Sequence, residues 1–244
     1  FIYLFFFLKE FDFSILQTAK YQFEVYNYLI LTSLLFILGF YDDKHDLSPN
    51  LKLITLMLLF SLTFFLDEGL QISILYFKNL EMTINIQSFS IVFIIFCLIV
   101  FTNATNMYDG INLQCSSYFL FLVLYIQTII KIDPFLSILS VGLLFFMVLN
   151  IKNKSYLGDS GVYILSFVIG VIIIKLYNQG YLYCDQIFLM MLLPGIDMIR
   201  LTFTRIFRGL HPFKADNDHI HHLMGKKFNE LQVFIINFSL IIIP

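Results

Sequence analysis

The chain has 244 residues, of which 59% are hydrophobic and only 13% charged, and its mean hydropathy is +0.84. Soluble domains carry about 25% charged residues, so this composition excludes an ordinary soluble protein and predicts a polytopic membrane protein. The formal net charge of −2 gives no reason to expect nucleic acid as a partner.

Long apolar runs predict an all-α, membrane-embedded fold, because a helix needs about 20 apolar residues to cross the hydrocarbon core. By this measure we expect a partial span at 1–8, full spans at 25–41, 51–66, 88–103, 113–132, 134–151, 160–177 and 185–206, and a truncated span at 231–244. No repeat or Pro/Gly/Ser linker divides the sequence, which predicts a single membrane-embedded domain over residues 1–244. Since the chain begins and ends inside apolar runs, we expect a fragment that lacks both native ends.

The stretch from residue 71 to residue 86 has a different pattern. Gln71–Ile74 and Thr83–Ile86 are short runs that contain Ile, Ser and Thr, and Lys78-Asn79 lies between them. Two such runs around a polar turn are typical of a β-hairpin. The sequence therefore predicts a small hairpin outside the membrane.

Four polar loops follow every second predicted span, so they are expected to share one side of the membrane. They lie at 42–46, 103–112, 150–159 and 205–227. Ten of the fifteen Lys and Arg residues fall on this side and five on the other, which makes it the cytoplasmic face by the positive-inside rule. We therefore expect a multi-pass protein of the inner (cytoplasmic) membrane whose active site can use soluble substrates such as nucleotides.

The first polar loop carries three carboxylates directly after a hydrocarbon run. If the helix continues past Tyr41, Asp42 and Asp43 lie four and three residues before Asp46, which would place all three on one helical face. Carboxylates next to lipid are costly and tend to mark functional sites, and hard cations such as Mg²⁺ take oxygen ligands. The alternative is a solvated helix end just outside the membrane.

The second polar loop suits a nucleotide. Asn103, Asn106 and Asp109 recur every third residue, so they are expected to share a face, and Gly110 permits a tight turn after them. The amides can hold a base or a sugar, and Asp109 can join a metal site. The alternative is a helix C-terminus stabilised by its own Asn side chains.

Two further carboxylates precede or interrupt apolar helices. Asp159 lies in a Gly-Asp-Ser-Gly stretch, where it could hold the Mg²⁺ of a phosphate bound at the helix start. Alternatively, Asp159 or Ser160 is simply the N-cap of that helix. Asp197 lies within the seventh full span, and pairing with Arg200 or Arg205 is the favoured interpretation.

The last polar loop holds four of the five histidines, among them His219, His221 and His222. Three interpretations are open: a zinc site, a plain loop and a cradle for a diphosphate. No Cys or Glu lies nearby to complete a tetrahedral zinc site, whereas Arg205 and Arg208 add positive charge. The pattern therefore favours the diphosphate cradle.

Together these clusters resemble glycosyltransferase family 4, the polyprenyl-phosphate N-acetylhexosamine-1-phosphate transferases. The matching motifs occur in the family's order over almost the whole chain. The first is Asp42-Asp43-x-x-Asp46, followed by Leu47-Ser48-Pro49 and Lys52, and the second is Asn103-Ala-x-Asn106-x-x-Asp109-Gly110. The others are Gly158-Asp159-Ser160-Gly161, then Asp197 with Arg205, and finally Asp216-x-x-His219-Ile220-His221-His222. The last motif is similar to the undecaprenyl-phosphate N-acetylglucosaminyl-1-phosphate transferase branch. One departure is Asn112, which stands where many members have a second Asp.

The resemblance implies that a polyprenyl phosphate attacks the β-phosphate of a UDP-N-acetylhexosamine, so that UMP leaves and a lipid-linked glycan of the cell envelope begins. It implies Mg²⁺, with Mn²⁺ as an alternative, held by Asp159, and catalytic roles for Asp42, Asp43 and Asp109. The residues that it implies for substrate binding are Asp46, Lys52, Asn103, Asn106, Asn150, Tyr156, Arg205, His219, His221 and His222. Membrane lipid surrounds such a protein, and a homodimer is compatible with it.

Two other functional classes fit parts of the pattern. An intramembrane prenyltransferase also uses Asp-rich motifs with Mg²⁺ and a prenyl diphosphate, but it would need a second Asp-rich helix. A non-enzymatic transporter would need polar residues in the middle of the membrane, whereas the polar residues here lie toward one face. The sequence names neither the sugar nor the pathway.

Overall fold

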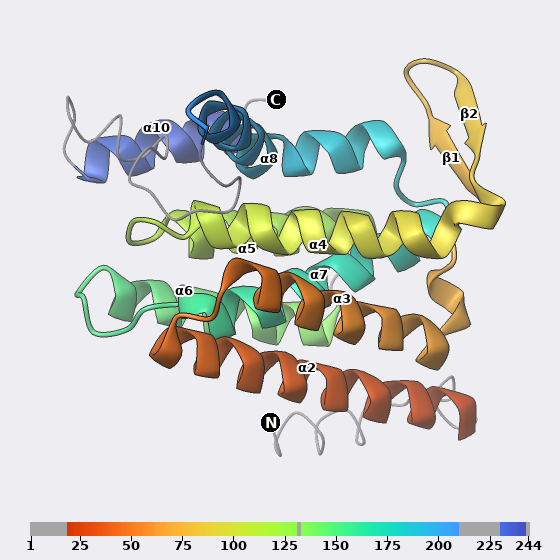
Figure 1. The fold of residues 1–244 in the computed structure, drawn as a ribbon, viewed down its shortest axis with the longest axis horizontal. Helices are drawn as coiled ribbons and strands as arrows, with labels where there is room; N and C mark the ends of the chain where they lie inside the picture. Colours follow the sequence, from red (N-terminus) through yellow and green to blue (C-terminus); the bar gives the residue numbers. More distant parts are fainter. Residues whose placement is uncertain (1–18, 131–132, 210–229, 243–244) are drawn as a thin grey trace.

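The computed structural model describes residues 19–130, 133–209 and 230–242, and within these ranges the protein is almost wholly helical (Figure 1). The helices are α2 (Ala19–His45), α3 (Pro49–Leu66), α4 (Ser90–Tyr108), α5 (Gln114–Ile130), α6 (Pro134–Asn150), α7 (Gly158–Asn178), α8 (Cys184–Phe207) and α10 (Glu230–Ile242), with short 3₁₀ turns η1 (Glu68–Leu70) and η2 (Gln87–Phe89). The strands are β1 (Ile74–Phe77) and β2 (Met82–Asn85). The predicted all-α membrane fold with a small hairpin is confirmed.

Local sequence explains where several helices begin. Pro49 and Pro134 each lie in the first turn of a helix, where the fixed φ angle of proline suits the helix and its missing N–H costs nothing. Asp133 caps α6, because its Oδ1 accepts a hydrogen bond of 3.0 Å from the backbone N–H of Leu136. These signals place the helix boundaries within a few residues of those predicted.

The protein is a multi-pass membrane protein. Among the described helices, four are long and apolar enough to cross a bilayer: Pro49–Leu66, Gln87–Tyr108, Gly158–Asn178 and Cys184–Phe207. The helices α5 and α6 are also apolar, but each has 17 residues. The sequence predicted full spans there as well, and 17 residues lie at the short end of the range of about 17–25 that crosses a bilayer.

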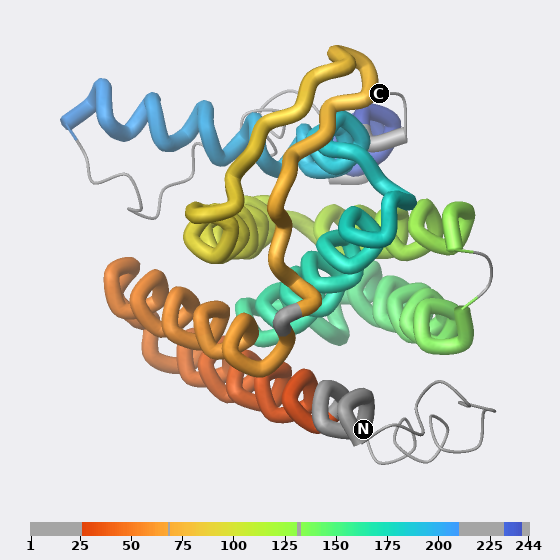
Figure 2. The backbone as a smooth tube through the Cα atoms, turned by 90° about the vertical axis from the view of Figure 1, so that its right-hand side faces the viewer, coloured from red at the N-terminus to blue at the C-terminus, as the bar shows by residue number. Residues whose placement is uncertain are grey.

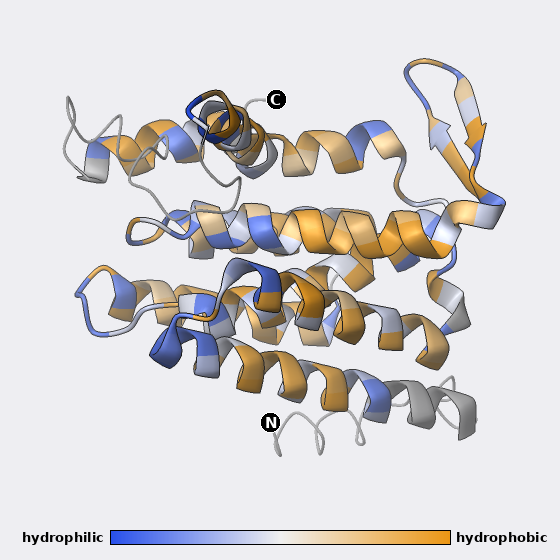
Figure 3. Cartoon of the chain, in the orientation of Figure 1, coloured by the Kyte–Doolittle hydropathy of each residue, from blue (hydrophilic) through white to orange (hydrophobic). Residues whose placement is uncertain are grey.

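Successive helices run in opposite directions, so alternate loops lie at the same end of the bundle (Figure 1). The loops 46–48, 109–113 and 151–157 are together at one end, and the hairpin lies at the other. Figure 3 shows hydrophilic residues at the first end and hydrophobic residues along most of the helix lengths. We call the first end the polar end and the other the hairpin end.

The helix α7 is the centre of the bundle and contributes to both hydrophobic cores. Tyr163 and Phe167 pack in one core with side chains of α2, α3 and α4. Val162 and Ile169 pack in the other with α5 and α6. Figure 2 shows α7 lying between these two groups of helices. Van der Waals packing is a main force between helices within lipid, so packing on both sides holds α7 in place, and its first turn at the polar end is held with it.

A glycine lets α2 approach the start of α7 closely. A Cβ atom added at Gly39 would lie 2.3 Å from Ser160 Cα and 2.4 Å from Ser160 N, much closer than an ordinary contact. Only a residue without a side chain permits this approach. The end of α2, which carries the first acidic cluster, is therefore in direct contact with the Gly158-Asp159-Ser160-Gly161 turn.

At the hairpin end, α7 is fastened to the segment that follows α3. Lys175 Nζ lies 2.8 Å from Asp67 Oδ2, and the Tyr177 hydroxyl donates a 2.7 Å hydrogen bond to the carbonyl of Ile74 in β1. The strands pair antiparallel, with Ile74 opposite Asn85. The predicted hairpin over 71–86 is thus confirmed, and its base is held by α7.

Candidate active site

Asp42 is the most buried carboxylate of the polar end, and every oxygen of its side chain has a donor. The side chain has no exposed surface, and its Oδ2 lies 2.8 Å from Lys52 Nζ. The same oxygen accepts a 2.9 Å hydrogen bond from the Tyr163 hydroxyl, and Oδ1 accepts a 3.0 Å bond from the backbone N–H of Leu47. A buried carboxylate is tolerated when it is paired and hydrogen-bonded in this way.

Asp43, the next residue, does something different: it caps α7 from another helix. Its Oδ1 accepts a 2.8 Å hydrogen bond from the backbone N–H of Asp159, and its Oδ2 accepts a 3.1 Å bond from the Ser160 hydroxyl. The first N–H groups of a helix have no partner within the helix, and a carboxylate there is favourable. Gly158 makes room for this carboxylate, since its φ angle is +64° and a Cβ on it would lie 2.8 Å from Asp43 Oδ2.

Asp159 is the carboxylate on which three elements converge. It lies in the first turn of α7 and is half-buried. Asn106 at the end of α4 donates a hydrogen bond from Nδ2 to Asp159 Oδ1, and Lys52 Nζ in α3 lies 3.4 Å from Asp159 Oδ2. The ammonium group of Lys52 therefore lies between the carboxylates of Asp42 and Asp159.

Asp109 directly follows α4 and faces the same group of charges. Burial raises its pKa to about 7, and the negative charges of Asp159 and Asp43 act in the same direction. A backbone hydrogen bond from Gly158 offsets a part of this shift. Asp109 thus lies beside Asp159 in the middle of the polar end, where a cation would lower the repulsion between the two carboxylates.

A polar cavity of about 210 Å³ opens beside Asp109. Its lining comes from the two loops after α4 and α6, and consists of Asp109, Gly110, Ile111, Asn112, Asn150, Tyr156 and Leu157. The Tyr156 side chain is 70% exposed, so its ring is free to cover a flat group in the cavity.

Asn150 joins these two loops. It is buried, its Oδ1 accepts a 2.6 Å hydrogen bond from the backbone N–H of Leu113, and its Nδ2 donates to the carbonyl of Ser155 at 2.8 Å. Nδ2 also lies 3.2 Å from Asn112 Oδ1, and Asn112 in turn donates to Asn153. Both ends of the Asn150 amide are therefore used within the protein, and these hydrogen bonds hold together the two loops that line the cavity.

Two expectations about the acidic residues are wrong. Asp42, Asp43 and Asp46 do not share a helical face, because α2 ends at His45 and Asp46 lies beyond it with a φ angle of 47°. Within α2 the two remaining carboxylates also diverge, since consecutive residues are about 100° apart around a helix. Neither Asp159 nor Ser160 is the N-cap of α7, because α7 begins at Gly158 and Asp43 caps it from outside.

The remaining predicted residues differ in how far they join this cluster. Asn103 is half-buried one and a half turns before the end of α4. The predicted pairing of Asp197 is confirmed, because Arg200 Nη2 lies 2.8 Å from its Oδ1. Arg205 is buried in the last turn of α8. The predicted histidine cradle of His219, His221 and His222 lies outside the described residues.

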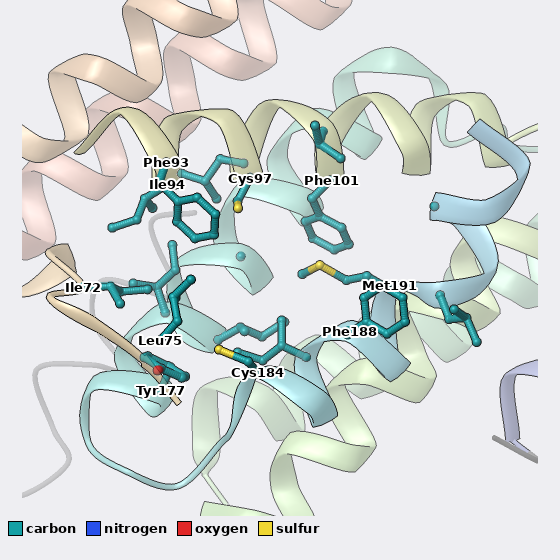
Figure 4. Close-up of a pocket in the computed structure, with 18 of the residues that line it drawn as sticks. Ile72, Leu75, Phe93, Ile94, Cys97, Phe101, Tyr177, Cys184, Phe188 and Met191 are labelled. Carbon is teal, nitrogen blue, oxygen red and sulfur yellow. The ribbon is translucent and has the colours of Figure 1, made fainter. Parts of the chain in front are cut away.

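A second, apolar cavity lies nearer the hairpin end, between β1, α4, α7 and α8 (Figure 4). Its volume is about 380 Å³, and side chains such as Phe93, Phe101, Phe188 and Met191 line it. Pro194 lies inside α8, where proline removes a helix hydrogen bond. The two halves of α8 accordingly point in different directions in Figure 1. Phe101 in the wall of this cavity lies eight residues before Asp109, which lines the polar cavity. At the rise of an α-helix, about 12 Å along α4 therefore separates these two residues.

Sequence reasoning missed Tyr163 and the role of Gly39. Tyr163 lies four residues after Asp159, one helical turn further along α7, and this spacing was the available signal. A tyrosine in an apolar helix usually means core packing, so the spacing alone does not distinguish the two roles. Only the contact with Asp42 in another helix makes Tyr163 part of the site.

Several curated proteins that are similar to this chain carry the same name. The undecaprenyl-phosphate alpha-N-acetylglucosaminyl 1-phosphate transferase of Escherichia coli K12 is 27% identical over 228 residues, which are 86% of this chain and 60% of that protein. The proteins of the same name from Yersinia pestis and Haemophilus influenzae are each 27% identical, and they cover 86% and 82% of this chain. The sequence profile of glycosyl transferase family 4 matches residues 25–177. The chain belongs to glycosyl transferase family 4.

The family assignment made from the motifs is therefore confirmed. The matched region of this family 4 protein contains Asp42, Lys52, Asp109 and Asp159, which the fold brings together at the polar end. The chain spans 60–61% of the length of the three named relatives, and the identity of 27% applies to the aligned residues alone.

Proposed function

We propose that this protein transfers an N-acetylhexosamine 1-phosphate from a UDP-sugar to a polyprenyl phosphate and releases UMP. The observation that carries the proposal is the position of the Lys52 ammonium, 2.8 Å from Asp42 and 3.4 Å from Asp159, next to the polar cavity beside Asp109. Transfer between phosphates depends on positioning and on neutralising charge more than on covalent chemistry by the protein. A fixed cation among carboxylates at a helix start suits this task.

The nucleotide would occupy the polar cavity. The Tyr156 ring is largely exposed and can stack on the uracil. The diphosphate would then lie toward Asp109 and Asp159, within reach of the Lys52 ammonium. Asn106 would fix the orientation of the Asp159 carboxylate, because it already donates to one of its oxygens.

A divalent metal ion fits the carboxylates of this site only if the substrate's phosphates supply further oxygen ligands. In the part of the chain that the structure describes, no three His, Cys, Asp or Glu side chains converge as a cage. Mg²⁺ usually binds through one or two carboxylates and the substrate's phosphates, and Asp159 and Asp109 supply that pair. These two residues would hold Mg²⁺, or Mn²⁺ in its place, and the bound ion would neutralise the charge of the diphosphate.

The two carboxylates of the first motif would act by orientation. Both carboxylate oxygens of Asp42 are engaged, by the Lys52 ammonium, the Tyr163 hydroxyl and the Leu47 N–H. Both oxygens of Asp43 accept hydrogen bonds from the start of α7. Neither is therefore poised to take a proton from the lipid phosphate. Asp42 instead holds the Lys52 ammonium toward the phosphates, and Asp43 holds the turn that carries Asp159.

The lipid acceptor would extend its hydrocarbon tail along the apolar cavity (Figure 4). This cavity is lined almost wholly by apolar side chains, and Phe188, Ile196 and Ile199 on its α8 wall are also exposed on the surface. An isoprenoid chain can enter such a cavity from the surrounding lipid. With the polar end on the cytoplasmic face of the inner membrane, the lipid phosphate and the soluble nucleotide would meet near Asp109.

The proposal is tested with membranes that contain the protein, a panel of radiolabelled UDP-sugars and added polyprenyl phosphate. We expect label from a UDP-N-acetylhexosamine to enter the lipid fraction only when polyprenyl phosphate is added. Asp159→Asn should reduce the transfer at least a hundredfold while the protein still folds, since the substituted amide no longer balances a cation. Transfer by Asp159→Asn at the wild-type rate would contradict the assigned role of this residue.

A further inference from the structure

Asp42 and Lys52 form an ion pair whose geometry depends on a third residue. Asp42 Oδ2 receives two donors, the Lys52 ammonium at 2.8 Å and the Tyr163 hydroxyl at 2.9 Å. Lys52 also lies 3.4 Å from Asp159 Oδ2. The ammonium is thus shared unequally between two carboxylates, and its position depends on how strongly Asp42 attracts it.

Tyr163 is well placed to control that attraction. It is 2% exposed, and its ring packs among buried side chains of α2, α3 and α4. It lies one turn after Asp159 on α7, so the two residues are on the same face of one helix. The helix therefore fixes the Asp159 carboxylate and the Tyr163 hydroxyl relative to each other.

We propose that Tyr163 is a positioning residue that acts through Asp42 to keep the Lys52 ammonium within reach of Asp159 and of the phosphates. The hydroxyl satisfies one lone pair of the buried Asp42 oxygen. Without it, that oxygen would have only Lys52 as a donor, and the ammonium would move closer to Asp42 and away from Asp159. This inference rests on the proposed function for its catalytic meaning, although the hydrogen-bonded geometry stands by itself.

The kinetic test is Tyr163→Phe, which removes the hydroxyl and keeps the ring. We expect kcat to fall about tenfold, equivalent to about 1.4 kcal/mol of transition-state stabilisation. KM for the UDP-sugar should change less than twofold, because Tyr163 is not among the residues that line the polar cavity. A role in packing alone would leave kcat unchanged, and that result would overturn the proposal.

The chain offers a matched control in Tyr118. This side chain is also fully buried, and its hydroxyl donates a 3.0 Å hydrogen bond to the backbone carbonyl of Met190 and not to a carboxylate of the candidate site. Tyr118→Phe should leave kcat within twofold of the wild type. If Tyr163→Phe fails to fold while Tyr118→Phe folds, the hydroxyl serves stability and the positioning role is refuted.

A second test does not depend on the proposed activity. Tyr163 and Lys52 share the partner Asp42, so the losses in melting temperature caused by Tyr163→Phe and Lys52→Met should not add in the double variant. Tyr118→Phe combined with Lys52→Met should be additive, because those sites share no partner. Additive losses for Tyr163 with Lys52 would refute the connection, even in a protein for which no UDP-sugar is a substrate. Inactivity of the wild type would instead refute the proposed function.

Discussion

The close contact between α2 and α7 makes Gly39 a sensitive position for stability and activity. We expect Gly39→Ala to damage both. A Cβ at this position would lie 2.3 Å from Ser160 Cα, and an ordinary contact needs at least 3.4 Å, so the two helices must separate by roughly 1 Å. The contact is with backbone atoms, so no side-chain rotation relieves it.

The magnitude follows from what the separation breaks. The hydrogen bond from Asp159 N to Asp43 Oδ1 is 2.8 Å long, and a lengthening of about 1 Å exceeds the range of an N–H···O bond. Overpacking costs about 1–3 kcal/mol, and the loss of a helix cap costs about 1 kcal/mol. We therefore expect unfolding to become easier by about 2–4 kcal/mol. A misplacement of about 1 Å in a catalytic group can lower the rate about a hundredfold.

The assay compares melting temperature and sugar-phosphate transfer for Gly39→Ala with the same values for Gly142→Ala. Gly142 lies within α6, and a Cβ there would have no atom within 4 Å. Alanine in place of a helical glycine is otherwise favourable by about 0.5–1 kcal/mol, so the control should be at least as stable as the wild type. If Gly39→Ala matches Gly142→Ala in both measurements, the contact does not position the site and this reasoning is refuted.

Three further predictions concern other parts of the chain. Gly158→Ala should destabilise the protein and reduce transfer at least tenfold, because its φ angle is +64° and the new Cβ would meet the Asp43 carboxylate; a variant with wild-type activity would show that this turn tolerates a side chain. Ser48→Cys at the polar end should react with a membrane-impermeant thiol reagent only from the cytoplasm, and labelling from outside would reverse the topology. Burial raises the pKa of Asp67, but hydrogen bonds from Lys175 and other donors outweigh it and lower the pKa overall. The stability from this pair should therefore be present above the unfolded pKa of about 3.9 and be lost as the pH falls below it. Relative to the wild type, Asp67→Asn should lower the melting temperature more at about pH 5 than at about pH 3, and an equal loss at the two pH values would contradict this.

Much of the fold could be predicted from the sequence, because hydrophobic length and helix-start signals are local. The runs that end at Leu66 and begin at Pro134 match helix ends in the structure, and the two short runs around Lys78 form the hairpin. The grouping of the polar loops also follows from counting helices. The predicted spans within α2, α5 and α6 are not among the four candidate membrane spans of the described helices, and α5 and α6 are at the short end of the length that crosses a bilayer.

Several residues proposed from the sequence lie together at the polar end, but the sequence did not predict which partners each of them contacts. Asp42 and Asp43 are neighbours in sequence, yet one is buried against Lys52 and the other caps a helix that begins 115 residues later. No local pattern distinguishes these two roles, because each depends on which helix packs against α2. The same holds for Asn150, a residue predicted to contact the nucleoside, whose amide closes the loops around the cavity.

The proposed reaction moves the sugar together with one phosphate, and a UDP-N-acetylglucosamine labelled at its β-phosphorus shows whether it does. With polyprenyl phosphate and membranes that contain the protein, we predict that the label enters the lipid fraction and that unlabelled UMP is released in equal amount. A protein that transfers the sugar alone would leave the label in UDP. Recovery of the label in UDP, with sugar in the lipid, would contradict the account.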